Sequence, residues 1–313
     1  MIRTAVAITL GLLCAPTLAD MRITPIAAGQ ADAALIQINQ DGSEPFTLVV
    51  DGGDHDNDLK NHLPAMMTGD STVELIVLSR PHLDHMGALD WLVRDSGFGI
   101  GRVWWKGETH TAGAFGEFET AIDNAGVVAT RPHEAFYHFV GSPNFTLRVF
   151  NNGQEFPGTA GKDLNNDSLV FQIIYEPRND VRVTAFFTGD IEEAQGAMPV
   201  SQFGDELKSD MVKVPHHGSD HLFDDFPAIV GADFAFVSST GTHETFKHPR
   251  QAALELYDDE GEIHCTWNEA LRPFHRAVTV DEDGAITVSP DQVPYLVWEK
   301  DLNDVLQKIT ITP

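Results

Sequence analysis

Cysteine and basic residues are scarce in this chain of 313 residues, and each scarcity argues against a class of protein. There are only 2 cysteines, so we expect neither a disulfide-rich scaffold nor a cysteine-rich zinc site. Lysine and arginine number 20 against 47 acidic residues, which gives a formal net charge of −27. Binding of a nucleic-acid polymer usually depends on clustered lysine and arginine, so such a partner is disfavoured rather than excluded.

Long apolar runs are also missing after the first twenty residues. Arg3 precedes an apolar stretch at 5–13, and residues 17–19 supply a small-residue cleavage site, which is typical of a secretory signal peptide. The apolar stretch is too short to span a bilayer. We therefore expect residues 1–19 to be a signal peptide and the mature protein to be periplasmic or secreted, without a membrane span.

The rest of the chain alternates apolar strands with helices, which predicts an α/β fold. Expected strands lie at 22–26, 33–38, 46–50, 73–78, 103–105, 169–175, 181–187, 211–214 and 234–238. Expected helices lie at 88–94, 114–126 and 250–258. An acidic loop is expected at 54–58, and short strands are expected at 263–267, 277–280 and 285–288. We expect one domain over residues 20–262 and a β-rich extension over 263–313 that packs on it.

Metal-competent side chains follow the expected strand at 73–78. His82, Asp84 and His85 lie within four positions, and the chain then turns into a helix at Ala88. Imidazole and carboxylate groups suit zinc, manganese or iron. The alternative is an exposed polar loop with two ordinary histidines, and ligands from distant parts of the chain would decide between the two.

Such polar residues follow three further expected strands, namely Asp51, Asp190 and the pair His216-His217. Strands of one sheet can end at the same edge, where side chains far apart in sequence build one site. Four placements of this kind favour a metal site over a chance arrangement.

The order of these motifs resembles that of the metallo-β-lactamase superfamily. The closer resemblance is to the branch containing the hydrolase domain of ComEC-type competence proteins and the phosphorylcholine esterases. The segments that carry it, in order, are Gly29–Ala33, Asp51–Gly53, Ser79–Ala88, Asn165–Val170, Phe187–Asp190, His216–Ser219 and His248-Pro249. The resemblance implies an αββα four-layer sandwich with a metal site at one edge, between the two sheets.

The resemblance also implies roles for individual residues. The implied metal ligands are Asp84, His85, Asp190 and His217 at one site, with His82 at a second. The Pro-His-His-Gly run favours His217 over His216 as the ligand and leaves His216 facing the substrate, although the sequence leaves this choice open. Candidates for supporting or substrate-contacting roles are Asp32, Asp51, Asn166 and His248.

Arg80 is a departure from the superfamily pattern, which has a histidine at this position. A guanidinium group stays protonated and cannot bind a metal ion. We therefore expect the second site to bind more weakly than the first, so that the chain holds one or two ions, zinc first and manganese or iron as alternatives. An alternative role for Arg80 is to bind a phosphate or carboxylate group on the substrate.

The sequence thus predicts an exported metal-dependent hydrolase that cleaves a phosphoester or phosphodiester of a small molecule with a metal-activated water. Asp84 would orient the water, and His216 or Arg80 would stabilise the developing negative charge. Two alternatives remain open. One is a lactam or lactone hydrolase, and the other is a catalytically degenerate binding protein on the same fold.

Overall fold

The computed structural model describes most of the chain. The described residues are 21–39, 44–54, 56–67, 70–107, 110, 113–139, 142–150, 157–158, 161–162, 164–239, 246–257, 262–265, 278–280, 285–288, 295–300 and 306–311. The predicted signal peptide, residues 1–19, lies outside them, as does part of the predicted extension after residue 262.

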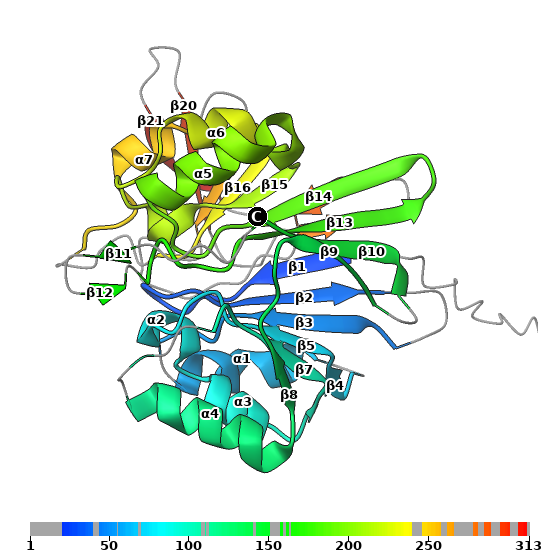
Figure 1. The fold of residues 1–313 in the computed structure, drawn as a ribbon. Coiled ribbons are helices and arrows are strands. Elements are labelled where there is room, and N and C mark those ends of the chain that lie inside the picture. The colour runs from blue at the N-terminus through cyan, green and yellow to red at the C-terminus, as the bar shows by residue number, and fades with distance from the viewer. Residues whose placement is uncertain are drawn as a thin grey trace, which may run out of the picture.

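Two large sheets pack face to face in the middle of the molecule (Figure 1). The first has the order β19 (Ile286–Val288), β18 (Val278–Val280), β1 (Met21–Pro25), β2 (Ala34–Ile38), β3 (Phe46–Val50), β5 (Leu75–Val77), β7 (Arg102–Trp104) and β8 (Val128–Thr130). The second has the order β21 (Leu306–Ile311), β20 (Tyr295–Lys300), β17 (Glu262–Cys265), β16 (Phe234–Val237), β15 (Met211–Lys213), β14 (Val181–Phe187), β13 (Phe171–Arg178), β10 (Ser142–Val149) and β9 (Ala135–Phe139). Two short pairs are β4 (Thr72–Val73) with β6 (Gly99–Ile100), and β11 (Pro157–Gly158) with β12 (Gly161–Lys162).

Helices form the two outer layers (Figure 1). Those on the side of the first sheet are α1 (Asp56–Met66), α2 (Leu83–Met86), α3 (Leu89–Arg94) and α4 (Gly113–Ala125). Those on the side of the second sheet are α5 (Glu193–Phe203), α6 (Asp225–Val230) and α7 (Gln251–Glu255), with 3-10 turns η1 (Gly204–Leu207) and η2 (Pro215–Gly218). The predicted αββα sandwich is confirmed.

The alternation of side chains along each strand builds the layers. In β3, Leu48 and Val50 face the apolar core between the sheets, while Val49 between them packs under the helices. Successive side chains of a strand point to opposite faces, so a strand covered on both sides reads as a continuous apolar run. β14 shows the same division, with Phe187 between the sheets and Phe186 under α6.

Parallel pairing brings several strand ends to one edge of the sandwich. β3 and β5 are parallel, as are β14, β15 and β16. Ala34 pairs with Val50 across the antiparallel β2 and β3, so β2 begins where β3 ends. The loops that carry the predicted site residues therefore meet at this edge.

Three features differ from the sequence expectation or extend it. An acidic loop was expected at 54–58, but α1 already begins at Asp56. β20 and β21 were not expected, and strands after residue 261 add to both sheets. The division into a domain and an extension remains a prediction.

Within the described residues, every helix is too short or too polar to cross a bilayer.

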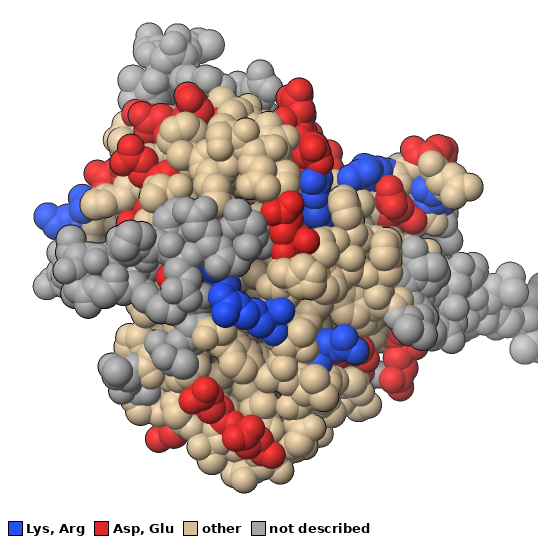
Figure 2. Space-filling model, viewed as in Figure 1, with Lys and Arg blue, Asp and Glu red and all other residues tan. Residues whose placement is uncertain are grey.

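Acidic side chains are spread over both helical layers on the face drawn in Figure 2. Lysine and arginine lie there in small, separated groups. This pattern agrees with the net charge of −27. On this face the arrangement does not favour a phosphate polymer, which would need a continuous basic surface.

Candidate metal centre

His85 lies in α2, directly after the loop that follows β5, and its side chain is fully buried. Its Nδ1 is 2.9 Å from Asp51 Oδ2 and 3.0 Å from Ser79 Oγ. Asp51 also accepts the backbone N–H of Ser79 at 2.7 Å. Histidines that bind a metal commonly donate their second N–H to a carboxylate in this way. His85 therefore directs Nε2 into the site.

His217 follows β15 in the turn η2, where two successive residues have left-handed backbone conformations. The φ angle is 47° at His216 and 53° at His217. Such angles are uncommon for residues other than glycine, and strain of this kind concentrates at functional sites. His217 Nδ1 is 3.0 Å from the carbonyl oxygen of Ser238, which can only accept, so Nε2 is left for a ligand.

Asp84 and Asp190 bring carboxylate oxygens to these two Nε2 atoms. Nε2 of His85 is 3.3 Å from Asp190 Oδ1 and 3.8 Å from Asp84 Oδ2. Nε2 of His217 is 3.4 Å from Asp190 Oδ2 and 3.2 Å from Asp84 Oδ2. Four ligand atoms bound tetrahedrally at about 2.0–2.1 Å lie roughly 3.3 Å from one another. The ligand set expected at the first site thus has the spacing of one coordinated ion.

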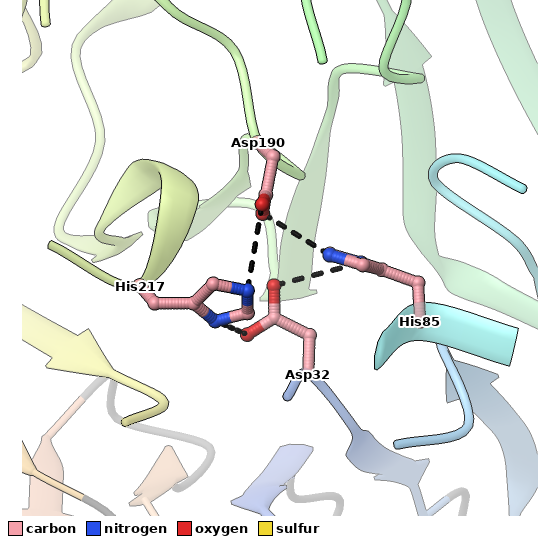
Figure 3. Close-up of side chains that lie close together, drawn as sticks. All are labelled: Asp32, His85, Asp190 and His217. Atoms are coloured by element: carbon pink, nitrogen blue, oxygen red, sulfur yellow. Dashed lines mark ion pairs between the residues drawn. The ribbon is translucent and has the colours of Figure 1, made fainter. Parts of the chain in front are cut away.

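Asp32 approaches the two histidines from the side opposite Asp190 (Figure 3). Asp32, His85, Asp190 and His217 each offer a ligand atom within 4.8 Å of the others. Asp32, however, faces Nδ1 of both rings, at 3.5 Å from His217 and 3.7 Å from His85. Those nitrogens already face Ser238 and Asp51. The geometry favours Asp32 as support beneath the site and Asp84 as the fourth ligand.

A buried nitrogen without a hydrogen bond fits a bound cation. Within the described residues, His85 Nε2 is buried and makes no hydrogen bond. Leaving such a group unsatisfied costs on the order of 1–3 kcal/mol. A divalent cation would satisfy this nitrogen, and imidazole with carboxylate suits zinc, manganese or iron.

Two cationic side chains are already present around these carboxylates. Arg80 is 3% exposed, and its Nη2 is 2.7 Å from Asp190 Oδ2 and 3.1 Å from Asp84 Oδ2. Lys213 is buried, pairs with Asp32, and has its Nζ 3.5 Å from Asp190 Oδ1. Lys213 was not expected at the site. The signal that could have found it is a lysine at the end of the otherwise apolar β15, directly before the paired histidines.

The charges of the site hold its titratable groups in definite states. Burial alone would lower the pKa of His217, but Asp190 and Asp32 raise it to about 10. Burial would also lower the pKa of His85, but Asp190 and Asp51 raise it to about 9. Burial would raise the pKa of Asp190, yet Arg80 and the histidines hold it well below its usual value. The carboxylates are therefore charged at pH 7, and metal binding must displace protons from both imidazoles.

A cavity of about 710 Å³ opens beside His217 and Asp84. Its lining includes Arg80, His82, Asp84, His216, His217 and His248. Burial and the nearby Arg80 lower the pKa of His82 to about 3, and burial with His216 lowers that of His248 to about 4. His82 and His248 are therefore neutral at pH 7, and the permanent positive charge on the lining is Arg80.

The remaining predicted residues lie around this cavity or behind it. His216 has Nδ1 3.0 Å from Glu192 Oε1 and Nε2 3.7 Å from Asp190 Oδ2. Asn166 accepts the backbone N–H groups of Glu192 at 3.0 Å and Gln195 at 2.8 Å, so its contacts are with the start of α5.

The second predicted site is not brought together as the first one is. The ring of His82 packs against that of His110 at 5.5 Å between centroids. Among the described residues no carboxylate forms an ion pair with His82, whereas Arg80 pairs with both Asp84 and Asp190. Whether His82 binds a metal remains a prediction.

Gly189 precedes Asp190 and leaves no room for a side chain. Its φ is +55°, and a Cβ there would lie 2.7 Å from Ser168 Cβ and 3.1 Å from Ser79 Cβ. We expect Gly189→Ala to lower the free energy of unfolding in urea by about 2–4 kcal/mol, from backbone strain and overpacking. Gly116→Ala is the matched control, because a Cβ in that part of α4 meets no described atom within 4 Å. Equal stability of the two variants would contradict this account.

Comparisons with known proteins give likenesses of structure only. No family model matches the chain, and no curated protein matches it. Several solved structures are similar, and three of them cover 66–84% of this chain. They are a mutant of the CmlA β-hydroxylase (10% identity, TM-score 0.46), the metallo-β-lactamase MIM-1 from Novosphingobium pentaromativorans (14%, 0.37) and TMB-1 (11%, 0.31).

The extent of these matches differs between the three structures. The match to the CmlA hydroxylase covers 84% of this chain and 54% of that protein, so this chain spans about half of it. The match to MIM-1 covers 66% of this chain and 80% of MIM-1, and the match to TMB-1 covers 68% of this chain and 91% of TMB-1. At these identities, what the chain does has to be argued from its own residues.

Proposed function

We propose that this chain is an exported metal-dependent hydrolase that cleaves a phosphoester or phosphodiester in a small molecule, with zinc as the first candidate metal. The observation that carries the proposal is the spacing of four ligand atoms. The Nε2 atoms of His85 and His217 lie 3.2–3.8 Å from Asp84 Oδ2 and from the nearer oxygen of Asp190, beside a cavity. Export rests on the sequence of residues 1–19 alone.

The residues that would hold the ion are Asp84, His85, Asp190 and His217. When bound, a divalent cation supplies a Lewis acid and lowers the pKa of a water ligand from about 15.7 towards 7. Asp51 and Ser238 fix the orientation of the two histidine rings. Neither ring needs to turn during the reaction, which keeps the site preorganised.

Asp84 is the proposed ligand that is open to the cavity. Its side chain is 31% exposed, whereas Asp190 is fully buried. Asp84 is thus placed to orient a water molecule and to accept its proton. Burial would raise the pKa of Asp84, but Arg80 and His85 keep it far below its usual value, so the group is a charged carboxylate that can accept a hydrogen bond from the water.

Positive charge on the cavity wall supports an anionic substrate. Arg80 lines the cavity and carries this charge. The Nη atoms of Arg80 already contact Asp84, Asp190 and Asn165. Arg80 would therefore act on the substrate through its positive charge rather than through a pair of hydrogen bonds. The volume of about 710 Å³ suits a small molecule. The strongly acidic surface opposes a nucleic-acid polymer.

The test is turnover by protein purified without chelator and loaded with zinc. We expect hydrolysis of bis-p-nitrophenyl phosphate and none of a chromogenic lactam, with zinc measured per chain by plasma mass spectrometry. Turnover of the lactam alone would replace the phosphoester by a carbonyl substrate. Bound zinc without turnover of either would overturn the phosphoester assignment, and no bound zinc would favour a binding protein on the same fold.

A further inference from the structure

We infer that this site binds one metal ion, because Arg80 and Lys213 supply the positive charge that a second divalent ion would otherwise bring. The inference rests on the proposed function and fixes the stoichiometry of the same site. It follows from where the two cations lie, from the carboxylates they contact and from the charge of the whole group.

Arg80 occupies the space between two of the proposed ligands. Its Nη2 is 2.7 Å from Asp190 Oδ2 and 3.1 Å from Asp84 Oδ2, and Asn165 accepts a hydrogen bond from its Nη1. A second ion that shared these two oxygens would compete with the guanidinium for them. The guanidinium is permanently charged, and a like charge within about 4–6 Å strongly disfavours another cation.

Lys213 neutralises the opposite side of the group. Its ammonium pairs with Asp32, lies 3.5 Å from Asp190 Oδ1, and donates a hydrogen bond to the carbonyl oxygen of Gly189 at 2.9 Å. The side chain is only 6% exposed. Asp190 thus has a fixed cation on each of its two oxygens, Arg80 at Oδ2 and Lys213 at Oδ1.

The charge of the buried group balances with one divalent ion. The charged side chains in mutual contact are Asp32, Asp51, Asp84, Asp190, Arg80 and Lys213. Four carboxylates and two cations leave two negative charges when both histidines are neutral ligands. One divalent ion cancels them, whereas a second would leave two uncompensated positive charges in a largely buried group, which is unfavourable.

The first experiment counts ions in the full chain. The protein is stripped of metal, incubated with excess zinc, desalted and analysed by plasma mass spectrometry. We expect one zinc per chain in the wild type and two in Arg80→His, which removes the charge and adds an imidazole near His82. Arg94→His is the matched control, because Arg94 is half exposed and pairs only with Asp90 and Asp95 among the described residues. It should hold one zinc.

The outcomes separate this inference from the proposed function. Two zinc ions in the wild type would overturn the inference and leave the hydrolase proposal standing, whereas none would overturn both. One zinc in the wild type and in Arg80→His alike would show that Arg80 is not what keeps a second ion out.

A second pair of variants removes charge without adding a ligand and does not depend on Arg80→His folding well. In Arg80→Met and Lys213→Met we expect one zinc per chain, bound about tenfold or more tightly in competition with a chelator, because a nearby like charge has gone. Lys208→Met is the control, since Lys208 is 66% exposed and pairs with the exposed Asp205. Unchanged zinc affinity in both buried variants would contradict the assigned role.

Discussion

Replacing Asp190 with alanine is expected to lower the zinc affinity of the chain by more than about 100-fold and to abolish hydrolysis. Residues that only support metal ligands typically contribute 10- to 100-fold. Asp190 contacts both ligand histidines directly, at 3.3 Å from His85 and 3.4 Å from His217. The measurement is zinc affinity by chelator competition, together with turnover of bis-p-nitrophenyl phosphate.

The same replacement is expected to destabilise the metal-free protein by about 3–5 kcal/mol. Asp190 is fully buried and is the shared partner of Arg80 and Lys213, so its removal leaves Arg80 with Asp84 alone and Lys213 with Asp32 alone as carboxylate partners. Urea unfolding of metal-free protein measures this loss.

Two further variants separate charge from shape at Asp190. Asp190→Asn keeps the shape and removes the charge, and should behave nearly as alanine does. Asp220→Asn changes an aspartate that is 50% exposed and should match the wild type. Wild-type zinc affinity in Asp190→Ala would remove Asp190 from the ligand set.

The meeting of the four proposed ligands was predictable, because it depends on the order of the strands more than on the conformation of each loop. Asp84, His85, Asp190 and His217 all follow apolar strands. Parallel pairing then places those strand ends at one edge. A pattern of residue types in the sequence is sufficient for this inference, because the side chains need only lie at the same edge of the sandwich.

Lys213 was not predictable in the same way. Lys213 lies in a run of apolar residues, and the sequence does not say that it faces Asp32 across the gap between the two sheets. Asn165 and Asn166 are neighbours, yet the first bonds to Arg80 and the second to the start of α5. A difference of one residue in a loop depends on its backbone conformation, which residue type does not determine.

The start of α1 shows a similar limit. The acidic residues at 54–58 suggested a solvated loop, because negative charges close together repel. The helix nevertheless begins at Asp56, and its inner face packs Leu59 and Leu63 under the first sheet. Packing of this face outweighed the local repulsion.

The pH dependence of zinc binding is expected to be steep, with affinity rising about 100-fold per pH unit between pH 6 and 8. The pKa values of about 9 for His85 and about 10 for His217 mean that both imidazoles carry a proton in the metal-free protein over this range. Each must lose that proton to bind zinc through Nε2. Chelator competition at pH 6, 7 and 8 measures the slope, and calorimetry in buffers of different ionisation enthalpy counts the protons released. His221→Gln, at a histidine that is 72% exposed, is the control and should keep the wild-type slope.

The stability of the metal-free protein should change in the opposite direction with pH. A folded-state pKa raised above the unfolded value of about 6.5 contributes stability that is complete below pH 6.5 and lost as pH rises through 9–10. One unit of such a shift corresponds to about 1.4 kcal/mol, so the two histidines together lose several kcal/mol between pH 6.5 and 10. With zinc bound, both imidazoles are neutral in the folded protein as well, so this alkaline loss should disappear. Urea unfolding at pH 7 and 10, with and without zinc, tests both halves of the argument. Metal-free protein that is equally stable at the two pH values would mean that His85 and His217 are not held as imidazolium ions by Asp190.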